Sequence, residues 1–156
     1  MASTVSFSDL GVERCLVQAL DNKGITEPFE VQREAIPDGM LGRDVCCRAP
    51  TGSGKTLAFG LPLLPRCRRS RPKLPTSLIL TPTRELAVQI YSVLTPLAAK
   101  VDLNVLAIYG GASYVTQIRA LERGIDIVVA CPGRLIDLMQ KGSLSLEDVD
   151  IIIIDE

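Results

Sequence analysis

The sequence predicts an α/β domain with a mostly parallel central sheet and helices on both faces of that sheet. One observation behind this prediction is that short β-branched runs alternate with segments of helical periodicity, which is typical of repeated βα units. Another is that the runs 125–130 and 151–154 are apolar on both faces, like interior strands of a parallel sheet. The 156 residues, of which 47% are hydrophobic, suffice for the core of one domain.

Five strands are predicted, at 44–48, 76–81, 104–109, 125–130 and 149–154. In the first of them, Cys46 and Cys47 are expected to pack as small core residues. The four consecutive isoleucines at 151–154 should lie inside the sheet and not at its edge. The reason is that full burial of one isoleucine side chain stabilises a fold by roughly 1.5–3 kcal/mol.

Helical periodicity is found ahead of the first strand and between the later ones. The segment 9–23 is expected to form a helix that ends at Gly24, and 31–36 a short second helix. Thr83 is expected to cap the helix that follows it, and Pro96 should kink or end that helix. Further helix boundaries are predicted at Gly124, Pro132 and Gly142.

Charge is distributed unevenly along the chain, although the formal net charge is only −1. Residues 45–84 carry eight basic side chains and no acidic one, whereas the segments before and after them are acidic. A stretch without acids inside a slightly acidic chain suggests that an anion is bound locally. The basic loop 66–73 within this stretch is expected to be a solvated surface loop and not an RNA-binding element.

Composition excludes several kinds of site. Because the sequence contains no histidine, a His-based catalytic triad, a His general base and a Cys/His zinc site are impossible. Five cysteines without C-x-x-C spacing favour a reducing compartment, so we expect a cytoplasmic protein. No signal peptide or membrane span is expected, because no basic segment precedes an apolar one at the N-terminus and no apolar run approaches roughly 18 residues.

The strongest functional motif is the segment 49–56, APTGSGKT, between a predicted strand and an apolar helix. It matches the phosphate-binding pattern G-x-x-x-x-G-K-[ST], with Ala49 in place of the first glycine. In such a loop, backbone N–H groups at a helix N-terminus bind phosphate, Lys55 reaches the β- and γ-phosphate oxygens, and the Thr56 hydroxyl is a ligand of Mg²⁺. The alternative is a strand–helix turn without a ligand, in which Lys55 would oppose the helix dipole. The predicted nucleotide contacts are Thr51, Gly52, Ser53, Gly54, Lys55 and Thr56.

Two acidic residues, Asp155 and Glu156, follow the isoleucine run. Ligands of an open parallel sheet bind beyond the carboxyl ends of its strands, so Asp155 is expected to hold Mg²⁺, usually through water. Glu156 is expected to orient or deprotonate the attacking water. The alternative is that both acids are simply solvated.

Residues 24–32, GITEPFEVQ, resemble the Q motif of the DEAD-box RNA helicases of superfamily 2, with Ile25 and Phe29 departing from the usual Phe and Thr. In that family the Gln hydrogen-bonds the adenine edge, and an aromatic residue 17 positions before the start of the motif, here Gly24, stacks on the ring. The resemblance therefore implies that Phe7 and Gln32 bind the adenine of ATP. The alternative is a helix-capping Gln32 and a core Phe7.

Three further segments resemble motifs that line the RNA backbone in the same family. They are 82–87, PTREL followed by Ala; the glycine pair 110–111; and 131–134, CPGR, in which Cys131 replaces the usual Thr. The alternative for Arg84 is a salt bridge with a carboxylate of the sheet. The RNA contacts that the resemblance implies are Pro82, Thr83, Arg84, Gly110, Gly111, Pro132, Gly133 and Arg134.

The resemblance covers nearly all of the chain and implies a RecA-like P-loop domain. A Q-motif region with the N-terminal helices would occupy 1–43, and the ATP-binding core 44–156, cut short after Asp155 and Glu156. The implied function is that of an ATP-dependent RNA helicase whose second RecA-like domain lies elsewhere in the parent chain. The fragment alone is expected to bind nucleotide weakly and not to unwind RNA.

Two other functions remain open from the sequence. One is a different P-loop NTPase, such as a nucleotide kinase or a DNA-directed helicase; a GTPase is disfavoured because no complete guanine-binding [N/T]-K-x-D motif is present. The other is a nucleotide- or RNA-binding module without catalytic activity.

Overall fold

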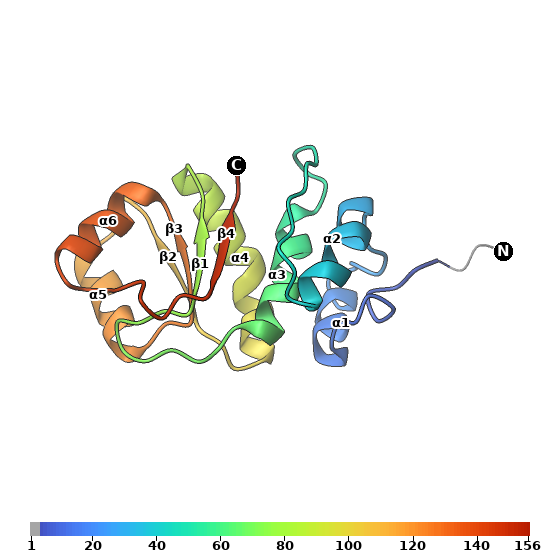
Figure 1. The fold of residues 1–156 in the computed structure, drawn as a ribbon, viewed down its shortest axis with the longest axis horizontal. Helices are drawn as coiled ribbons and strands as arrows, with labels where there is room; N and C mark the ends of the chain where they lie inside the picture. The colour runs from blue at the N-terminus through green and yellow to red at the C-terminus, as the bar shows by residue number, and fades with distance from the viewer. Residues whose placement is uncertain (1–3) are drawn as a thin grey trace. The chain divides into compact units, whose positions relative to one another are not determined.

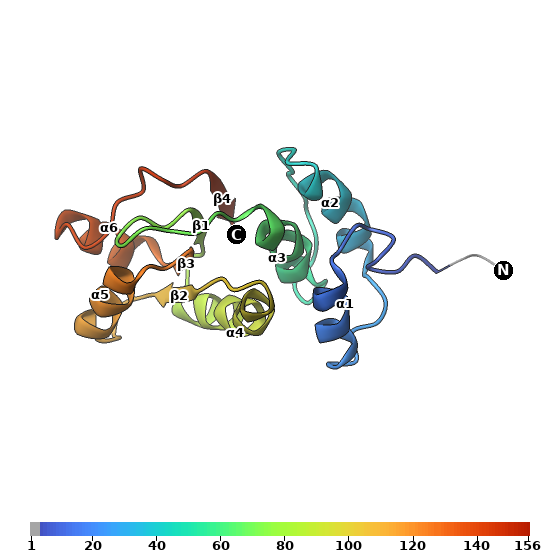
Figure 2. The ribbon, with the colours of Figure 1, turned by 90° about the horizontal axis from the view of Figure 1, so that it is seen from below.

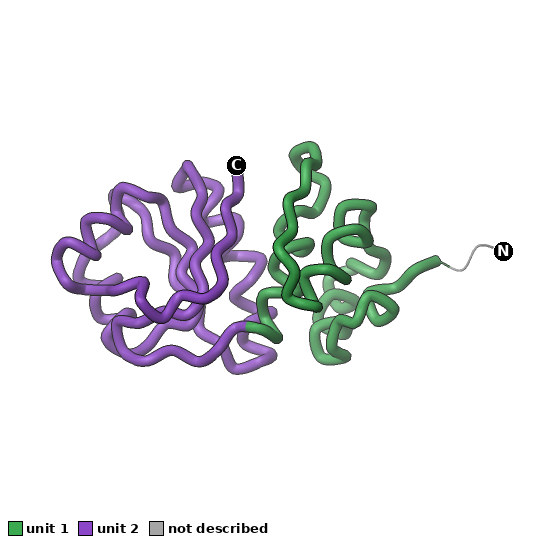
Figure 3. The backbone as a smooth tube through the Cα atoms, in the orientation of Figure 1, with its two compact units in different colours: residues 1–66 green, residues 67–156 purple. Residues whose placement is uncertain are grey.

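The computed structural model describes residues 4–156 and divides the chain into two compact units, Met1–Arg66 and Cys67–Glu156. Figure 3 shows the first unit in green and the second in purple. Across the described residues, no helix is long and apolar enough to cross a membrane.

The first unit contains the helices α1 (Arg14–Asp21), α2 (Glu30–Met40) and α3 (Lys55–Arg66) (Figure 1). Its largest fully buried side chains come from all three helices and from the segment before α1. Helices α2 and α3 approach closely, since a Cβ added to Gly39 would lie 2.8 Å from the Cβ of Pro62. Helix α1 is shorter than the predicted helix 9–23, and helix α2 is longer than the predicted helix 31–36. The largest fully buried side chains of the first unit are those of Phe7, Leu16, Leu20, Ile36, Leu61 and Leu64.

The predicted strand 44–48 is wrong, because the structure assigns this segment to neither helix nor strand. A strand is stabilised by hydrogen bonds to a neighbouring strand, and the elements of the first unit, over the residues described, are all helices. The prediction that Cys46 and Cys47 pack in the core is wrong for the same reason, since both side chains are exposed.

The second unit is built on a sheet of four parallel strands in the order β2-β3-β1-β4. The strands are β1 (Ser77–Leu80), β2 (Val105–Ile108), β3 (Ile127–Ala130) and β4 (Ile151–Ile154). The register places Ile79 of β1 opposite Val129 of β3 and Ile153 of β4. The prediction of an α/β fold with a parallel sheet is confirmed.

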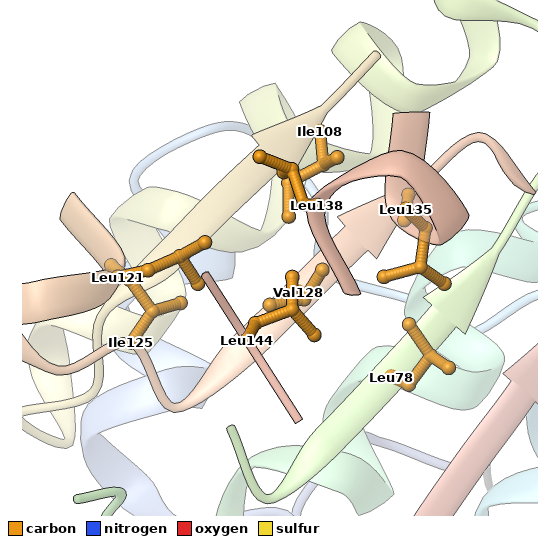
Figure 4. Packing of buried hydrophobic residues seen from close by; sticks show 9 residues of the cluster. Leu78, Ile108, Leu121, Ile125, Val128, Leu135, Leu138 and Leu144 are labelled. Carbon is orange, nitrogen blue, oxygen red and sulfur yellow. The ribbon is translucent and has the colours of Figure 1, made fainter. Parts of the chain in front are cut away.

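Helices cover both faces of this sheet. Helix α4 (Arg84–Lys100) lies on one face, and α5 (Tyr114–Arg123) and α6 (Pro132–Gln140) lie on the other (Figures 1 and 2). Because side chains alternate along a strand, Leu78 and Val128 point toward α5 and α6, while the buried Ile79 and Val129 belong to the other face. Figure 4 shows the cluster on the side of α5 and α6, made by Leu78, Ile108, Leu121, Ile125, Val128, Ala130, Leu135, Leu138 and Leu144.

The helix boundaries follow their sequence cues. The Thr83 hydroxyl accepts a hydrogen bond from the Leu86 N–H at 3.3 Å and so caps α4. Pro132 is the first residue of α6, and Gly124 ends α5 with a φ of +100°, where glycine is favoured. These predictions are confirmed.

Helix α4 continues through Pro96 to Lys100, so the prediction that the helix could end there is wrong. Pro96 lacks the N–H that would bond to the carbonyl of Ser92. The helix continues because residues on both sides of the proline are anchored in the core. Leu94 and Leu97 are 0% and 1% exposed.

The isoleucine run does form a strand, but the prediction that it lies inside the sheet is wrong. Strand β4 is an edge strand whose neighbour is β1. Ile152 and Ile154 are 60% and 75% exposed, and Ile151 and Ile153 are half-buried. An apolar run therefore buries alternate residues here, as a one-sided edge strand does.

The start of the sheet is organised by Asp126, which is 4% exposed. Its carboxylate accepts hydrogen bonds from the backbone N–H of Ser70 at 2.7 Å and of Asn104 at 2.8 Å. Two acidic residues near β4 also pair with the basic loop that precedes β1. The pairs are Arg68 with Asp150 at 2.7 Å and Arg71 with Asp148 at 3.0 Å, and these arginines stay exposed.

Candidate functional site

The predicted phosphate-binding loop leads directly into α3, which begins at Lys55. Gly52 and Gly54 have φ values of +80° and +83°, which glycine adopts far more readily than other residues. Thr51 and Gly52 are exposed, and Ser53, Gly54, Lys55 and Thr56 are half-buried. The loop thus presents its backbone at the N-terminus of a helix, which is a favourable place for an anion.

Ser53 provides an independent indication of a ligand. Its hydroxyl oxygen is buried and has no hydrogen-bond partner among the described residues. A buried polar group without a partner costs about 1–3 kcal/mol. A phosphate oxygen bound in this loop would supply the missing partner.

A cavity of about 470 Å³ adjoins the loop within the first unit. This volume lies in the range of small-molecule binding sites. Phe29, which is 58% exposed, belongs to the cavity wall. In the sequence Phe29 appears only as a departure from the Q motif, so its position beside the loop was missed. The available indication was that a phenyl ring at the start of α2 cannot accept the capping hydrogen bond of a threonine. The lining residues include Phe29, Val31, Glu34, Arg48, Ala49 and Ser53.

Gln32 connects α2 to the phosphate-binding loop. Its Oε1 accepts a hydrogen bond from the backbone N–H of Phe29 at 2.8 Å, and its Nε2 donates one to the carbonyl of Gly54 at 3.0 Å. The side chain is 2% exposed. The helix-capping alternative is therefore what this structure contains, and hydrogen bonding to adenine requires the buried amide to become accessible.

Phe7 is 1% exposed and belongs to the core of the first unit. Stacking on adenine would need part of the ring to become accessible. The adenine roles of Phe7 and Gln32 both stay predictions.

The candidate ligands of Mg²⁺ come from different units, so their proximity stays a prediction. Thr56 lies in the first turn of α3. Asp155 follows β4, where its N–H donates to the carbonyl of Leu80 at 2.9 Å, and Glu156 is the next residue. Hydroxyl and carboxylate oxygens are the donors that Mg²⁺ prefers. Within residues 4–156, no group of three or more Cys, Asp or Glu side chains forms a metal-binding cluster.

The three motifs expected to bind RNA are brought to one edge of the second unit. They follow the carboxyl ends of β1, β3 and β2, which are neighbouring parallel strands. Pro82, Thr83 and Arg84 are exposed after β1. Gly110 and Gly111 are exposed after β2, as are Pro132 and Gly133 after β3.

Both arginines of these motifs contact tyrosine rings. The Arg84 guanidinium lies 5.1 Å from the centre of the Tyr109 ring, and that of Arg134 lies 3.7 Å from the centre of the Tyr114 ring. Arg134 Nη1 also donates hydrogen bonds to the carbonyl of Ala112 at 2.9 Å and to Oε1 of Gln117 at 3.0 Å. Arg134 is half-buried, whereas Arg84 is exposed.

Tyr114 and Gln117 were missed from the sequence. Gln117 is 3% exposed and donates through Nε2 to the carbonyl of Tyr109 at 3.3 Å. Its position within an apolar helical stripe was the available indication, because a buried amide needs hydrogen-bond partners. Cys131 lies in the same region, and burial raises the pKa of its thiol.

The chain is similar in sequence to known RNA helicases. The chain is 44% identical over 152 residues to the ATP-dependent RNA helicase DeaD of Escherichia coli strain K12. It is 40% identical over 157 residues to the DEAD-box ATP-dependent RNA helicase 9, mitochondrial, of Arabidopsis thaliana. Each alignment covers 97% of this chain but 24% and 25% of the relatives, so the chain spans about a quarter of their length.

Solved structures are similar to this chain as well. The RNA helicase Prp28 from Chaetomium thermophilum bound to ADP superposes with a TM-score of 0.88 at 40% identity, over 96% of this chain and 38% of that one. A DEAD box protein from the hyperthermophile Methanococcus jannaschii superposes with a TM-score of 0.88 at 36% identity, over 97% and 41%. A family model described as DEAD/DEAH box helicase matches residues 29–156. The chain therefore belongs to the DEAD/DEAH box helicase family.

Proposed function

We propose that this chain is the ATP-binding domain of an ATP-dependent RNA helicase, which couples ATP hydrolysis to the unwinding or remodelling of RNA. The observation that carries the proposal is the glycine loop at the start of α3, where the buried Ser53 hydroxyl has no hydrogen-bond partner in the part of the chain that the structure describes. The names of the relatives support the choice of ATP and RNA.

In this proposal the loop binds the phosphates of ATP. Backbone N–H groups of Gly52 and Gly54 and the Ser53 hydroxyl donate hydrogen bonds to phosphate oxygens, and the ammonium group of Lys55 neutralises part of their charge. Phe7, Phe29 and Gln32 are the candidates for contacts to the base. Phe29 is the one of the three whose ring is already exposed beside the cavity.

Thr56 and Asp155 would hold Mg²⁺, which when bound neutralises charge on the phosphates. Glu156 would orient the attacking water and accept its proton. The second RecA-like domain of the parent chain is proposed to complete the site with a cationic side chain, a contribution worth about 10³–10⁵ in rate where it has been measured in other NTPases. The isolated chain is therefore expected to bind ATP weakly and not to unwind RNA.

RNA is proposed to lie along the edge formed by the three motifs after β1, β2 and β3. Exposed glycines allow close approach of a sugar–phosphate chain, and Arg84 supplies positive charge. Contacts of this kind bind the backbone, so the affinity should depend little on sequence and strongly on salt. A cytoplasmic location is proposed as well, on the support of the five free thiols.

The experiment is a measurement of phosphate release by the full-length protein with ATP or GTP, in the presence of single-stranded RNA or DNA of the same sequence. The proposal expects hydrolysis of ATP that RNA stimulates and DNA does not. Stimulation by DNA alone would favour a DNA-directed helicase. Equal turnover of GTP and ATP, or transfer of the phosphate to another nucleotide, would favour a different P-loop NTPase.

A further inference from the structure

The loop that carries the glycine pair, 109–112, connects β2 to α5 and is fixed by a closed set of hydrogen bonds. Gln117 donates to the carbonyl at the start of the loop, that of Tyr109, at 3.3 Å. Arg134 donates to the carbonyl at its end, that of Ala112, at 2.9 Å. Arg134 also donates to Gln117 at 3.0 Å, so one arginine and one glutamine hold both ends of the loop and each other.

Gln117 cannot contact RNA from its position, because the residue is 3% exposed. Both polar groups of its amide are used inside the protein, the NH₂ toward Tyr109 and the oxygen toward Arg134. Buried amides are retained where such bonds specify one conformation of the surrounding backbone. The backbone that Gln117 specifies is the glycine loop.

Arg134 is held in place before any ligand arrives. Its guanidinium lies 3.7 Å from the centre of the Tyr114 ring, and the hydroxyl of Tyr114 donates in turn to Asp137. A planar guanidinium stacked in this way loses little further freedom when it forms hydrogen bonds. Its Nη1 is directed at the loop and at Gln117.

Arg84 also lies close to the loop. Gly111 has a φ of +88°, and a Cβ added there would lie 3.2 Å from Nη1 of Arg84. The loop backbone thus has three polar side chains close to it, those of Arg84, Arg134 and Gln117.

We propose that Gln117 and Arg134 are positioning residues that set the conformation of the glycine loop, and that the affinity for RNA depends on them through this loop. The proposal rests on the proposed function, since the loop is a candidate RNA-binding element only in that context. The proposal gives Arg134 a different role from the one that the family resemblance implies. Arg134 holds neutral backbone groups of the loop in place and does not pair with a phosphate.

The test uses the difference between neutral and charged contacts. The slope of log K against log salt is negative, and loss of one cation that pairs with a phosphate of single-stranded RNA reduces its magnitude by about 0.7. Loss of a positioning residue lowers the affinity but leaves that slope unchanged, because backbone N–H groups release no counterions.

The experiment is a salt titration of the binding of a fluorescent single-stranded RNA to the full-length protein. The variants are Gln117→Met, which is close in size to the native residue, and Arg134→Met. Each is expected to weaken binding by about tenfold, the equivalent of about one to two hydrogen bonds, with an unchanged salt slope. The double variant should bind no more weakly than the more severe single variant, since both act on one loop.

Further readouts separate positioning from general destabilisation. In RNA-stimulated ATP hydrolysis, the RNA concentration for half-maximal stimulation should rise by a similar factor, while turnover at saturating RNA and the affinity for ATP stay unchanged. The matched control, Gln140→Met at an exposed site at the end of α6, should leave RNA binding unchanged. If Gln117→Met does not fold, Gln117→Glu takes its place; it removes the donor to Tyr109 but keeps an acceptor for Arg134.

Failure of the proposal is distinguishable from failure of the proposed function. If the unmodified protein binds no RNA, the proposed function is wrong. If it binds RNA and the folded Gln117 variant binds equally well, the positioning role of Gln117 is wrong. A salt slope reduced by about 0.7 in Arg134→Met would assign Arg134 to a phosphate and overturn its positioning role.

Discussion

Gly54 occupies the most restricted position of the phosphate-binding loop. A Cβ added there would lie 2.3 Å from Nε2 of Gln32 and 2.8 Å from Cδ2 of Phe29, and the φ of +83° is unfavourable for other residues. The bond between Gln32 and the Gly54 carbonyl depends on this close approach. Gly54 therefore serves both the shape of the loop and its connection to α2.

We predict that Gly54→Ala lowers the free energy of unfolding by about 1–3 kcal/mol and weakens ATP binding at least tenfold, because the loop must move away from Gln32. Urea unfolding and titration with a fluorescent ATP analogue measure the two effects. Gly52→Ala provides the comparison, since its φ of +80° is similar but, apart from its chain neighbours, no described residue has a heavy atom within 4 Å of an added Cβ. Equal destabilisation by both substitutions would show that the contact with Gln32 is unimportant.

Motif spacing in the sequence predicted the residues of the glycine loop and of the strand ends. It did not predict the residues whose role depends on their being buried against other elements. The loop 51–56 and the exposed RNA motifs lie where the pattern placed them, at a helix N-terminus and at strand ends. Gln117 and Tyr114 belong to no such motif and acquire their partners only when β2, α5 and α6 are packed together. Long-range hydrogen bonds of this kind leave no periodic trace in a sequence.

At the scale of elements, Asp126 joins three segments at the start of the sheet. We predict that Asp126→Ala lowers the free energy of unfolding by about 2–4 kcal/mol, because the N–H groups of Ser70 and Asn104 lose their acceptor. Asp126→Asn, which keeps one acceptor oxygen, should cost less. Urea unfolding measures both, with Glu122→Ala at an exposed site of α5 as the control. Similar values for Asp126→Ala and Glu122→Ala would contradict this role.

The position of β4 can be tested with one substitution at two sites. Ile154 is 75% exposed on the edge strand, and Ile127 is 0% exposed on β3. We predict that Ile127→Ala costs about 2–5 kcal/mol and Ile154→Ala no more than about 0.5 kcal/mol. Equal costs in urea unfolding would mean that β4 is an interior strand, as its composition alone suggests.

Four of the five predicted strands are present, because β-branched runs near turn residues specify them locally. The segment 44–48 and the burial of β4 were mispredicted for a shared reason. Whether a run pairs on one side, on both or on neither depends on its neighbours in space, and composition does not give these. Pro96 shows the same limit, since core contacts around it override its effect on α4.

At the scale of the whole molecule, chemistry is divided between the two units. The first holds the phosphate-binding loop and its cavity, and the second holds the acidic pair and the three RNA motifs. The fold class and the gathering of the three motifs at one edge were predictable, because the carboxyl ends of parallel strands meet at one edge. That Thr56 of the first unit and Asp155 of the second hold the same Mg²⁺ stays a prediction.

The central claim is that Lys55 and its loop bind the ATP whose hydrolysis RNA stimulates. The measurement that tests it most directly is RNA-stimulated phosphate release by the full-length protein and by its Lys55→Ala variant. Lys23→Ala, at an exposed site after α1, is the matched control. We predict a loss of about 10²-fold or more for Lys55→Ala, because the phosphates lose a charged partner, and no change for Lys23→Ala. Retained RNA-stimulated turnover in the folded Lys55→Ala protein would contradict the assignment.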